Sequence, residues 1–376
     1  MNLKNSMILA NMMSQKPKIM YATIKGTLTE NDGVFSGFSA SNYLALQQPF
    51  TLTPTTKAEF VIKAKATEFV AGTAVLGTFG SYGISLQLSN VLHLYLGDGS
   101  SWNIVSNLSG RTSLSVDTDY WVKIIIDNGN VSLLLSTDGI TYTTEATTTM
   151  SITESYNYNL TYGIARLGAT YFRGSIDLNN SYIKLGSTKY NLQAVVGYTI
   201  VGSPTIVDGV VSGFSSANYL TLSTSPNLSE ETEIVTKINR NSNNNAQFII
   251  GWKSDSVYSV GIYLSAGKII ANYQRSADGS NQRLLLGTKV YDANTDYYIK
   301  LIKTNNSLSL FYSTNGNSWE QDAIAEFTDM PSFAVSRFRI GVGADTTPNA
   351  PFDGSIYINE TYIKVNNKLW FNGQQA

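Results

Sequence analysis

Apolar and polar residues alternate along most of this chain with the period of two that is typical of half-buried β-strands. Residues 58–66 show the pattern well, with apolar and charged residues taking alternate places (Ala58, Phe60, Ile62 and Ala64 against Glu59, Lys63 and Lys65). Residues 120–126 repeat it, and Asn128-Gly129 then supplies the two residue types that tolerate the positive φ angles of a tight hairpin. No amphipathic helix of three turns is evident. The pattern therefore predicts an all-β fold.

The same pattern occurs twice along the chain. Residues 32–44 (DGVFSGFSASNYL) return as residues 208–220 (DGVVSGFSSANYL), and residues 118–123 (TDYWVK) return as residues 295–300 (TDYYIK). The offset of about 176 to 180 residues far exceeds the length of a solenoid or propeller repeat, so each copy is a whole domain. We predict two tandem domains over residues 21–195 and 196–376, preceded by an N-terminal arm over residues 1–20.

Composition narrows the range of functions. Charged residues make up only 14% of the chain and the formal net charge is −1, which disfavours a nucleic-acid-binding protein. Cysteine is absent, so neither a disulfide framework nor thiolate chemistry is available. No apolar run approaches 18 residues, and the apolar stretch 7–10 is too short for a convincing signal peptide. These features favour an extracellular or particle-surface β protein that is assembled in a cytoplasm.

Four segments together resemble the concanavalin A-like lectin/glucanase superfamily in its laminin-G-like form. They are the early GFSxxNYL segment, the strand DYWVK, the hairpin LLLSTDGITY and the closing GSIDLNNSYIK. The resemblance covers almost the whole chain and implies two curved β-sandwiches of the jelly-roll type, a fold often used for carbohydrate recognition. Domains of this style also resemble modules of bacteriophage virion proteins, such as head or tail fibres, and bacterial surface adhesins.

Catalytic constellations are weak in this sequence. The carboxylate cluster that glucanases of the superfamily carry on one strand has no match here, and Glu230-Glu231 lies in a loop-like stretch. His93 is the only histidine, so a zinc site or a serine–histidine–aspartate triad is close to excluded. Residues 136–142 and 313–319 resemble the Asp-box hairpin of sialidases, which is a folding element. We therefore expect no enzymatic activity.

The sequence offers candidate residues for two kinds of ligand, calcium and sugars. Laminin-G-like domains sometimes bind calcium through loop oxygens, but each candidate aspartate directly precedes a turn glycine, which explains it without a metal (Asp32, Asp98, Asp208 and Asp278). No cofactor is therefore predicted, and calcium is the alternative that stays open. Sugars stack on exposed aromatic rings, and loop aromatics without a counterpart in the other copy are the better candidates. The predicted glycan contacts are Trp102, Tyr95, Trp252 and Tyr263.

The N-terminal arm holds five of the chain's seven methionines, and methionine suits adaptable apolar contacts with a partner. The arm is either a disordered tail or an anchor that binds another virion component or a second copy of the chain. The predicted anchoring residues are Met7, Ile8, Leu9, Met12 and Met13. The leading hypothesis is a non-enzymatic protein of a bacteriophage virion surface that touches host-surface or mucosal glycans, with no nucleic acid and no membrane insertion. The alternative is a secreted bacterial carbohydrate-binding module or adhesin.

Overall fold

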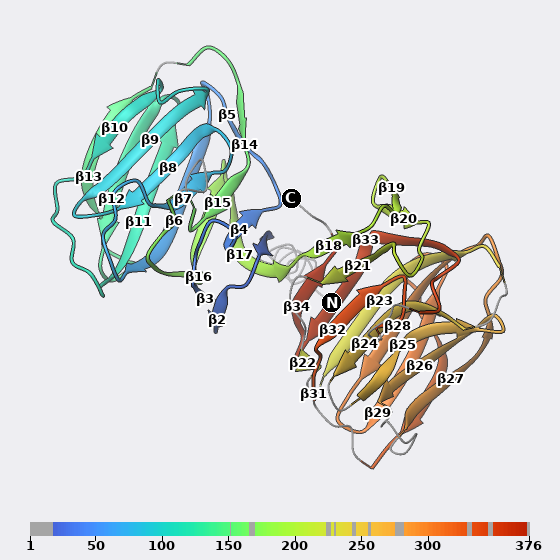
Figure 1. The fold of residues 1–376 in the computed structure, drawn as a ribbon. Helices are drawn as coiled ribbons and strands as arrows, with labels where there is room; N and C mark the ends of the chain where they lie inside the picture. The colour runs from blue at the N-terminus through green and yellow to red at the C-terminus, as the bar shows by residue number, and fades with distance from the viewer. Residues whose placement is uncertain are drawn as a thin grey trace, which may run out of the picture. The chain divides into compact units, whose positions relative to one another are not determined.

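The computed structural model describes residues 18–373, apart from residues 151, 165–169, 223–226, 229–230, 243–245, 255–256, 275–281, 329–332 and 345–348. Within this part of the chain every regular element is a β-strand, and no helix is long and apolar enough to cross a membrane. The chain divides into two compact units, unit 1 over residues 1–194 and unit 2 over residues 195–375 (Figure 1). The all-β fold predicted from the alternating pattern is confirmed.

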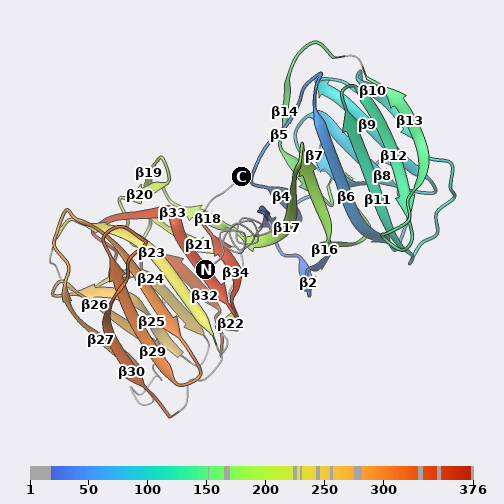
Figure 2. The same cartoon turned by 180° about the vertical axis from the view of Figure 1, so that it is seen from behind.

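Unit 1 is a sandwich of two antiparallel layers, called sheets 1A and 1B, which are joined at one side where β1 (Lys18–Lys25) pairs with β17 (Thr188–Val196) (Figure 2). Sheet 1A runs in the order β13 (Thr143–Thr149), β12 (Asn130–Ser136), β11 (Asp119–Asp127), β6 (Lys57–Ala66) and β16 (Gly174–Leu185). The free side of β16 pairs with β3 (Val34–Ser36) and β17 (Thr188–Val196), and β3 pairs with β2 (Thr29–Asn31).

Sheet 1B has the order β1 (Lys18–Lys25), β4 (Tyr43–Leu46), β15 (Leu160–Tyr162), β7 (Ala74–Thr78), β8 (Tyr82–Leu88), β9 (Leu92–Gly99) and β10 (Val105–Ser109). A short ribbon of β5 (Phe50–Leu52) and β14 (Tyr156–Tyr158) completes the unit.

Unit 2 repeats this strand order. Sheet 2A contains β30 (Glu320–Glu326), β29 (Ser307–Ser313), β28 (Asp296–Lys303), β23 (Thr232–Arg240) and β33 (Gly354–Val365), flanked by β34 (Lys368–Asn372), β20 (Val210–Ser212) and β19 (Thr205–Val207). Sheet 2B contains β18 (Tyr198–Val201), β21 (Tyr219–Leu222), β32 (Arg337–Ile340), β24 (Gln247–Ser254), β25 (Val257–Ser265), β26 (Lys268–Gln274) and β27 (Arg283–Val290), and the small ribbon is β22 (Asn227–Leu228) with β31 (Phe333–Ala334).

The alternating residues decide which side of each sheet faces the core. In β6, Phe60 and Ile62 are fully buried, whereas Lys63 and Lys65 point to the outer face of sheet 1A. The β11–β12 hairpin turns at Asn128 and Gly129 with φ angles of 49° and 84°, the two positive values that a two-residue hairpin turn requires. Side chains of the two sheets interdigitate to form one continuous core in unit 1.

The predicted arm is shorter than the sequence suggested. Strand β1 begins at Lys18, and Met20 is only 3% exposed within the core of unit 1. Assigning residues 18–20 to the arm was therefore wrong, because the apolar side chain of Met20 packs inside the sandwich instead of extending toward a partner. The predicted anchoring residues Met7, Ile8, Leu9, Met12 and Met13 lie outside the described residues.

Candidate functional site

Three aromatic rings gather on the outer face of sheet 1B in unit 1. The ring of Trp102 lies 5.2 Å from that of Tyr82 in an edge-on arrangement and 5.6 Å from that of Tyr95 in a tilted one. Tyr95 points outward because its strand neighbours Leu94 and Leu96 fill the core. All three side chains are half-buried, so each retains contact with solvent. We call Tyr82, Tyr95 and Trp102 the aromatic platform.

The loop after β9 is built to hold Trp102 against the sheet. One carboxylate oxygen of Asp98 accepts hydrogen bonds from the Ser100 amide and hydroxyl and from the Ser101 amide, at 2.8, 2.7 and 2.9 Å. Its other oxygen accepts a hydrogen bond from the Asn103 side-chain amide. These donors, led by the Ser100 hydroxyl, hold the pKa of Asp98 well below its ordinary value.

Gly97 allows this loop to fold back closely. A Cβ at this position would lie 2.3 Å from the Ser101 carbonyl oxygen and 2.5 Å from that of Tyr82, so any other residue would push the loop away. Asp98, which the sequence marked as a turn residue before Gly99, thus stabilises the loop that carries a candidate ligand contact.

Polar side chains adjoin the platform on β9 and β10. The Nδ1 atom of His93 lies 2.9 Å from the Ser109 hydroxyl and 3.1 Å from the Asn107 side-chain oxygen, and its ring lies 6.4 Å from that of Tyr95. Ligand sites in proteins commonly combine aromatic surface with a few hydrogen-bonding groups that fix orientation. The outer face of sheet 1B offers both, next to one another.

The matching face of unit 2 differs. Aligning the core pairs Leu88–Leu92 and Leu264–Ile269 places Asn272 where unit 1 has Tyr95. The same alignment places Tyr263 at the position of Gln87. Tyr263 is half-buried and packs against Phe248, with ring centroids 5.2 Å apart. It is a separate aromatic pair and does not reproduce the arrangement of unit 1.

Trp252 was wrongly assigned to a glycan site. Its side chain is fully buried in unit 2, its indole N–H donates to the Tyr273 carbonyl oxygen at 3.3 Å, and its ring stacks on that of Phe338. A sugar cannot stack on a ring that solvent does not reach. Trp252 was taken for a loop aromatic without a counterpart in the other copy, but it lies inside β24. Irregular pairing of β24 with β25, on both sides of residues 250–252, obscures the alternation that would have shown the strand and its core-facing side.

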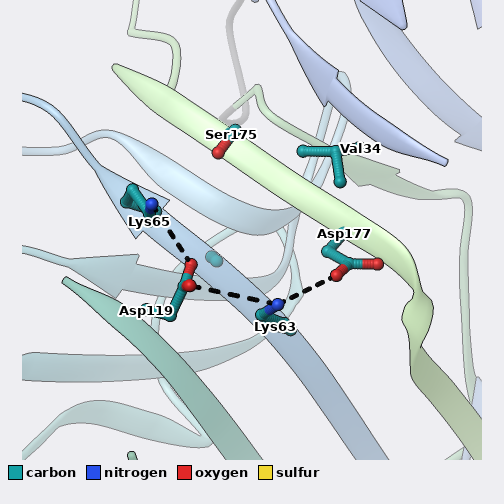
Figure 3. A pocket seen from close by; sticks show the side chains of 7 residues that line it. Val34, Lys63, Lys65, Asp119, Ser175 and Asp177 are labelled. Atoms are coloured by element: carbon teal, nitrogen blue, oxygen red, sulfur yellow. Dashed lines mark hydrogen bonds and ion pairs between the residues drawn. The ribbon is translucent and has the colours of Figure 1, made fainter. Parts of the chain in front are cut away.

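A second feature of unit 1 is a charged pocket on the outer face of sheet 1A, with a volume of about 160 Å³ (Figure 3). Its lining residues come from β3, β6, β11 and β16 (Val34, Lys63, Ala64, Lys65, Asp119, Ser175 and Asp177). The Lys63 ammonium lies 3.1 Å from Asp177 and 4.0 Å from Asp119, and that of Lys65 lies 3.8 Å from Asp119. No sequence motif pointed to this pocket, because Lys63 and Asp177 are 114 residues apart.

The pocket carboxylate Asp177 is held in its ionised form. Burial works to raise its pKa, but hydrogen bonds from the Asn180 side chain and backbone and from Lys63 outweigh burial, and the pKa lies below its ordinary value. A general acid for glycoside hydrolysis needs the opposite shift.

The Asp-box-like hairpins are folding elements, as the sequence indicated. Asp138 accepts hydrogen bonds from the amides of Thr141 and Ile140, both at 2.8 Å, and its pKa falls to about 2. The Tyr142 ring then covers the Lys123 ammonium at 3.9 Å, and in unit 2 Trp319 covers Lys300 at the same distance. Among the described residues no cluster of three or more histidine, cysteine or acidic side chains could hold a metal ion.

Comparisons with known proteins bear on the fold. No protein-family model and no curated protein matches the chain. Among solved structures, domains LG4-5 of the mouse laminin alpha1 chain are 12% identical, with a TM-score of 0.32 over 94% of this chain and 95% of that one. The CBM40 module of a Ruminococcus gnavus sialidase, solved with alpha2,3-sialyllactose, is 20% identical, with a TM-score of 0.30 over 37% of this chain and 77% of that one.

A third solved structure is the enzymatically active domain of tailspike protein 2 of bacteriophage CBA120. It is 13% identical, with a TM-score of 0.33 over 48% of this chain and 33% of that one. Laminin LG domains are thus among the structures similar to this chain. Because the identities are low, the function proposed below rests on the chain's own residues.

Proposed function

We propose that the protein is a non-enzymatic glycan-binding protein whose unit 1 stacks sugar rings on the aromatic platform. The observation that carries the proposal is the arrangement of Tyr82, Tyr95 and Trp102 on one outer face, with Trp102 fastened there by Asp98. Aromatic side chains present a large apolar face with a polar rim, which matches the apolar face and hydroxyl edge of a pyranose. His93, Asn107 and Ser109 supply donors and acceptors beside the rings.

A non-enzymatic role is supported by the state of the carboxyl groups. Glycoside hydrolysis needs one carboxyl that stays protonated at the working pH. Asp177 and Asp98 both have lowered pKa values, because hydrogen-bond donors stabilise their charged forms. The three platform residues carry no charge. The nearby Asp98 carboxylate already accepts hydrogen bonds from residues of its own loop.

A glycan array tests this proposal. The full chain is compared with Trp102→Ala and with Trp319→Ala, a matched half-buried tryptophan whose ring rests on Lys300 in unit 2. Loss of a central aromatic contact commonly costs about 2 kcal/mol or more, which corresponds to roughly 30-fold in affinity. We expect that loss for Trp102→Ala and none for Trp319→Ala. Equal binding by all three proteins would contradict the platform.

We further propose that the protein lies on the surface of a bacteriophage virion. The low charge, the many Ser, Thr and Asn residues and the absence of cysteine in the chain support this location, because they suit a particle-surface β protein. Antibodies against unit 1 should label purified particles, and removal of residues 1–17 should prevent incorporation while leaving both units folded. Incorporation of the truncated protein at the normal level would contradict the anchoring role of Met7 to Met13.

A further inference from the structure

We propose that the charged pocket of sheet 1A is a second binding site, for a single polyhydroxylated ring, and that unit 2 carries the same site closed by its own side chain. The site lies on the opposite sheet from the aromatic platform and is independent of it. The internal duplication of the chain carries the inference, because each copy serves as a reference for the other.

Strand registers define the matching positions. Asp177 pairs with both Lys63 and Val34 in unit 1, and Tyr357 pairs with both Lys237 and Val210 in unit 2. In the same way Asp119 opposite Lys65 matches Asp296 opposite Asn239. The lysine on the central strand and the aspartate on its neighbour are kept in both copies, whereas Asp177 is replaced by Tyr357 and Lys65 by Asn239.

That tyrosine occupies the position of the pocket in unit 2. The Tyr357 hydroxyl donates to Asp296 at 3.0 Å, the Asn239 amide donates to the same oxygen at 2.7 Å, and Lys237 lies 4.0 Å from the centre of the Tyr357 ring. A six-membered ring with a hydroxyl group therefore lies beside the retained lysine and aspartate, which are ion-paired at 3.2 Å in unit 2 and stand 4.0 Å apart in unit 1. Unit 2 thus shows that a hydroxylated six-membered ring fits beside this lysine–aspartate pair.

In unit 1 the Asp119 carboxylate is open to a ligand, whereas the Lys63 ammonium is mostly buried, bonded to Asp177 and 4.9 Å from the centre of the Trp121 ring. No described residue donates a hydrogen bond to the Asp119 carboxylate, whose side chain is 43% exposed, and the two ammonium groups stand 3.8 and 4.0 Å away. A ligand hydroxyl can donate to Asp119 and accept from Lys63 or Lys65, as the Tyr357 hydroxyl donates to Asp296. The pocket volume of about 160 Å³ is close to the roughly 150 Å³ of a cavity that holds a benzene ring.

The charges select a neutral ligand. Two lysines and two aspartates sum to zero, so neither an anion nor a cation gains a net attraction. Asp177 keeps the pocket open. Hydrogen bonds from Lys63 and Asn180 hold its short side chain against the pocket wall, whereas a tyrosine at this position would fill the space. The ligand class is therefore a pyranose or another cyclic polyol.

Saturation-transfer NMR with methyl pyranosides tests the proposal on the full chain. The closing variant combines Asp177→Tyr with Asn180→Glu and so introduces the residues that unit 2 has as Tyr357 and Glu360. The new glutamate keeps a carboxylate beside the lysine, because Glu360 lies 3.2 Å from Lys237 in unit 2. Because methyl pyranosides can also stack on the aromatic platform, the comparison is made in the Trp102→Ala background. We expect that protein to bind at least one pyranoside and the closing variant in the same background to bind at least tenfold more weakly. Asp119→Asn, which keeps the size of the side chain, should weaken binding by a similar factor.

Two further measurements distinguish this site from the aromatic platform and from a site for a charged ligand. Trp102→Ala should leave pyranoside binding at the pocket intact even where it removes binding to the glycan array, so the two sites can fail separately. Binding should also change less than twofold between low and high salt, since no net charge is neutralised. Absence of saturation transfer in wild type, unchanged binding in both pocket variants, loss of binding in Trp102→Ala or a steep salt dependence would each overturn the proposal.

Discussion

Replacing Trp252 by alanine should destabilise unit 2 without affecting glycan binding. Burying an aromatic side chain removes roughly 150–250 Å² from water, which at about 25 cal/mol per Å² corresponds to about 4–6 kcal/mol. Trp→Ala substitutions in protein cores cost about 3–5 kcal/mol. Trp252 is fully buried, stacks on Phe338 and also loses its hydrogen bond to the Tyr273 carbonyl. We expect a loss of about 4 kcal/mol in the free energy of unfolding.

Calorimetry of the full chain measures this effect. For a unit of this size each kcal/mol lowers the melting temperature by about 2–4 °C, so the transition of unit 2 should fall by roughly 8–16 °C. Trp252→Phe, which keeps most of the ring volume, should recover more than half of that loss. Trp102→Ala, from a half-buried position, should cost no more than about 1–2 kcal/mol. A Trp252→Ala protein with an unchanged melting temperature, or with weaker glycan binding, would refute the assignment of Trp252 to the core.

Three other outcomes are expected. Glu145 accepts hydrogen bonds from the Arg111 and Thr112 amides at 2.8 Å; although burial works to raise its pKa, these bonds and that from the Thr112 hydroxyl lower it. A lowered pKa in the folded state means that this stabilisation is complete above the unfolded pKa and is lost as pH falls, so denaturation of Glu145→Gln below about pH 4.3 should depend less on pH than that of wild type. Asp98→Ala should speed amide exchange at Ser100 and Ser101 and weaken glycan binding, while a matched Asp127→Ala change should do neither. A chelator should leave the melting temperature within about 1 °C, and a larger fall would show that a metal stabilises the fold.

The fold was largely predictable because alternation and turn chemistry are local. Phe60 and Ile62 face the core and Lys63 faces outward, as their alternation indicated, and the positive φ angles at Asn128 and Gly129 follow from residue types that tolerate them. Prediction failed at Trp252, where irregular pairing shifts the side of the sheet that a residue faces.

The sites were less predictable, because they depend on pairings between distant strands. Trp102 and Tyr95 were named from the sequence, but the contact of Trp102 with Tyr82 depends on the fold of the 98–103 loop. The charged pocket required knowledge that β16 lies beside β6. One signal was present all the same. The closing segment GSIDLNNSYIK returns as GSIYINETYIK, and its two non-conservative differences, Asp177 to Tyr357 and Asn180 to Glu360, lie at the pocket.

The proposed function requires that sugar rings contact Trp102 on the platform of unit 1. The chain contains five tryptophans, so protein labelled with 5-fluorotryptophan should give five fluorine resonances, each assigned by one Trp→Phe substitution. The glycan that binds most strongly on the array is then titrated into the labelled protein. We expect a saturable shift of the Trp102 resonance, with those of Trp252 and Trp319 unchanged. A saturable shift at another tryptophan while Trp102 stays in place would contradict it.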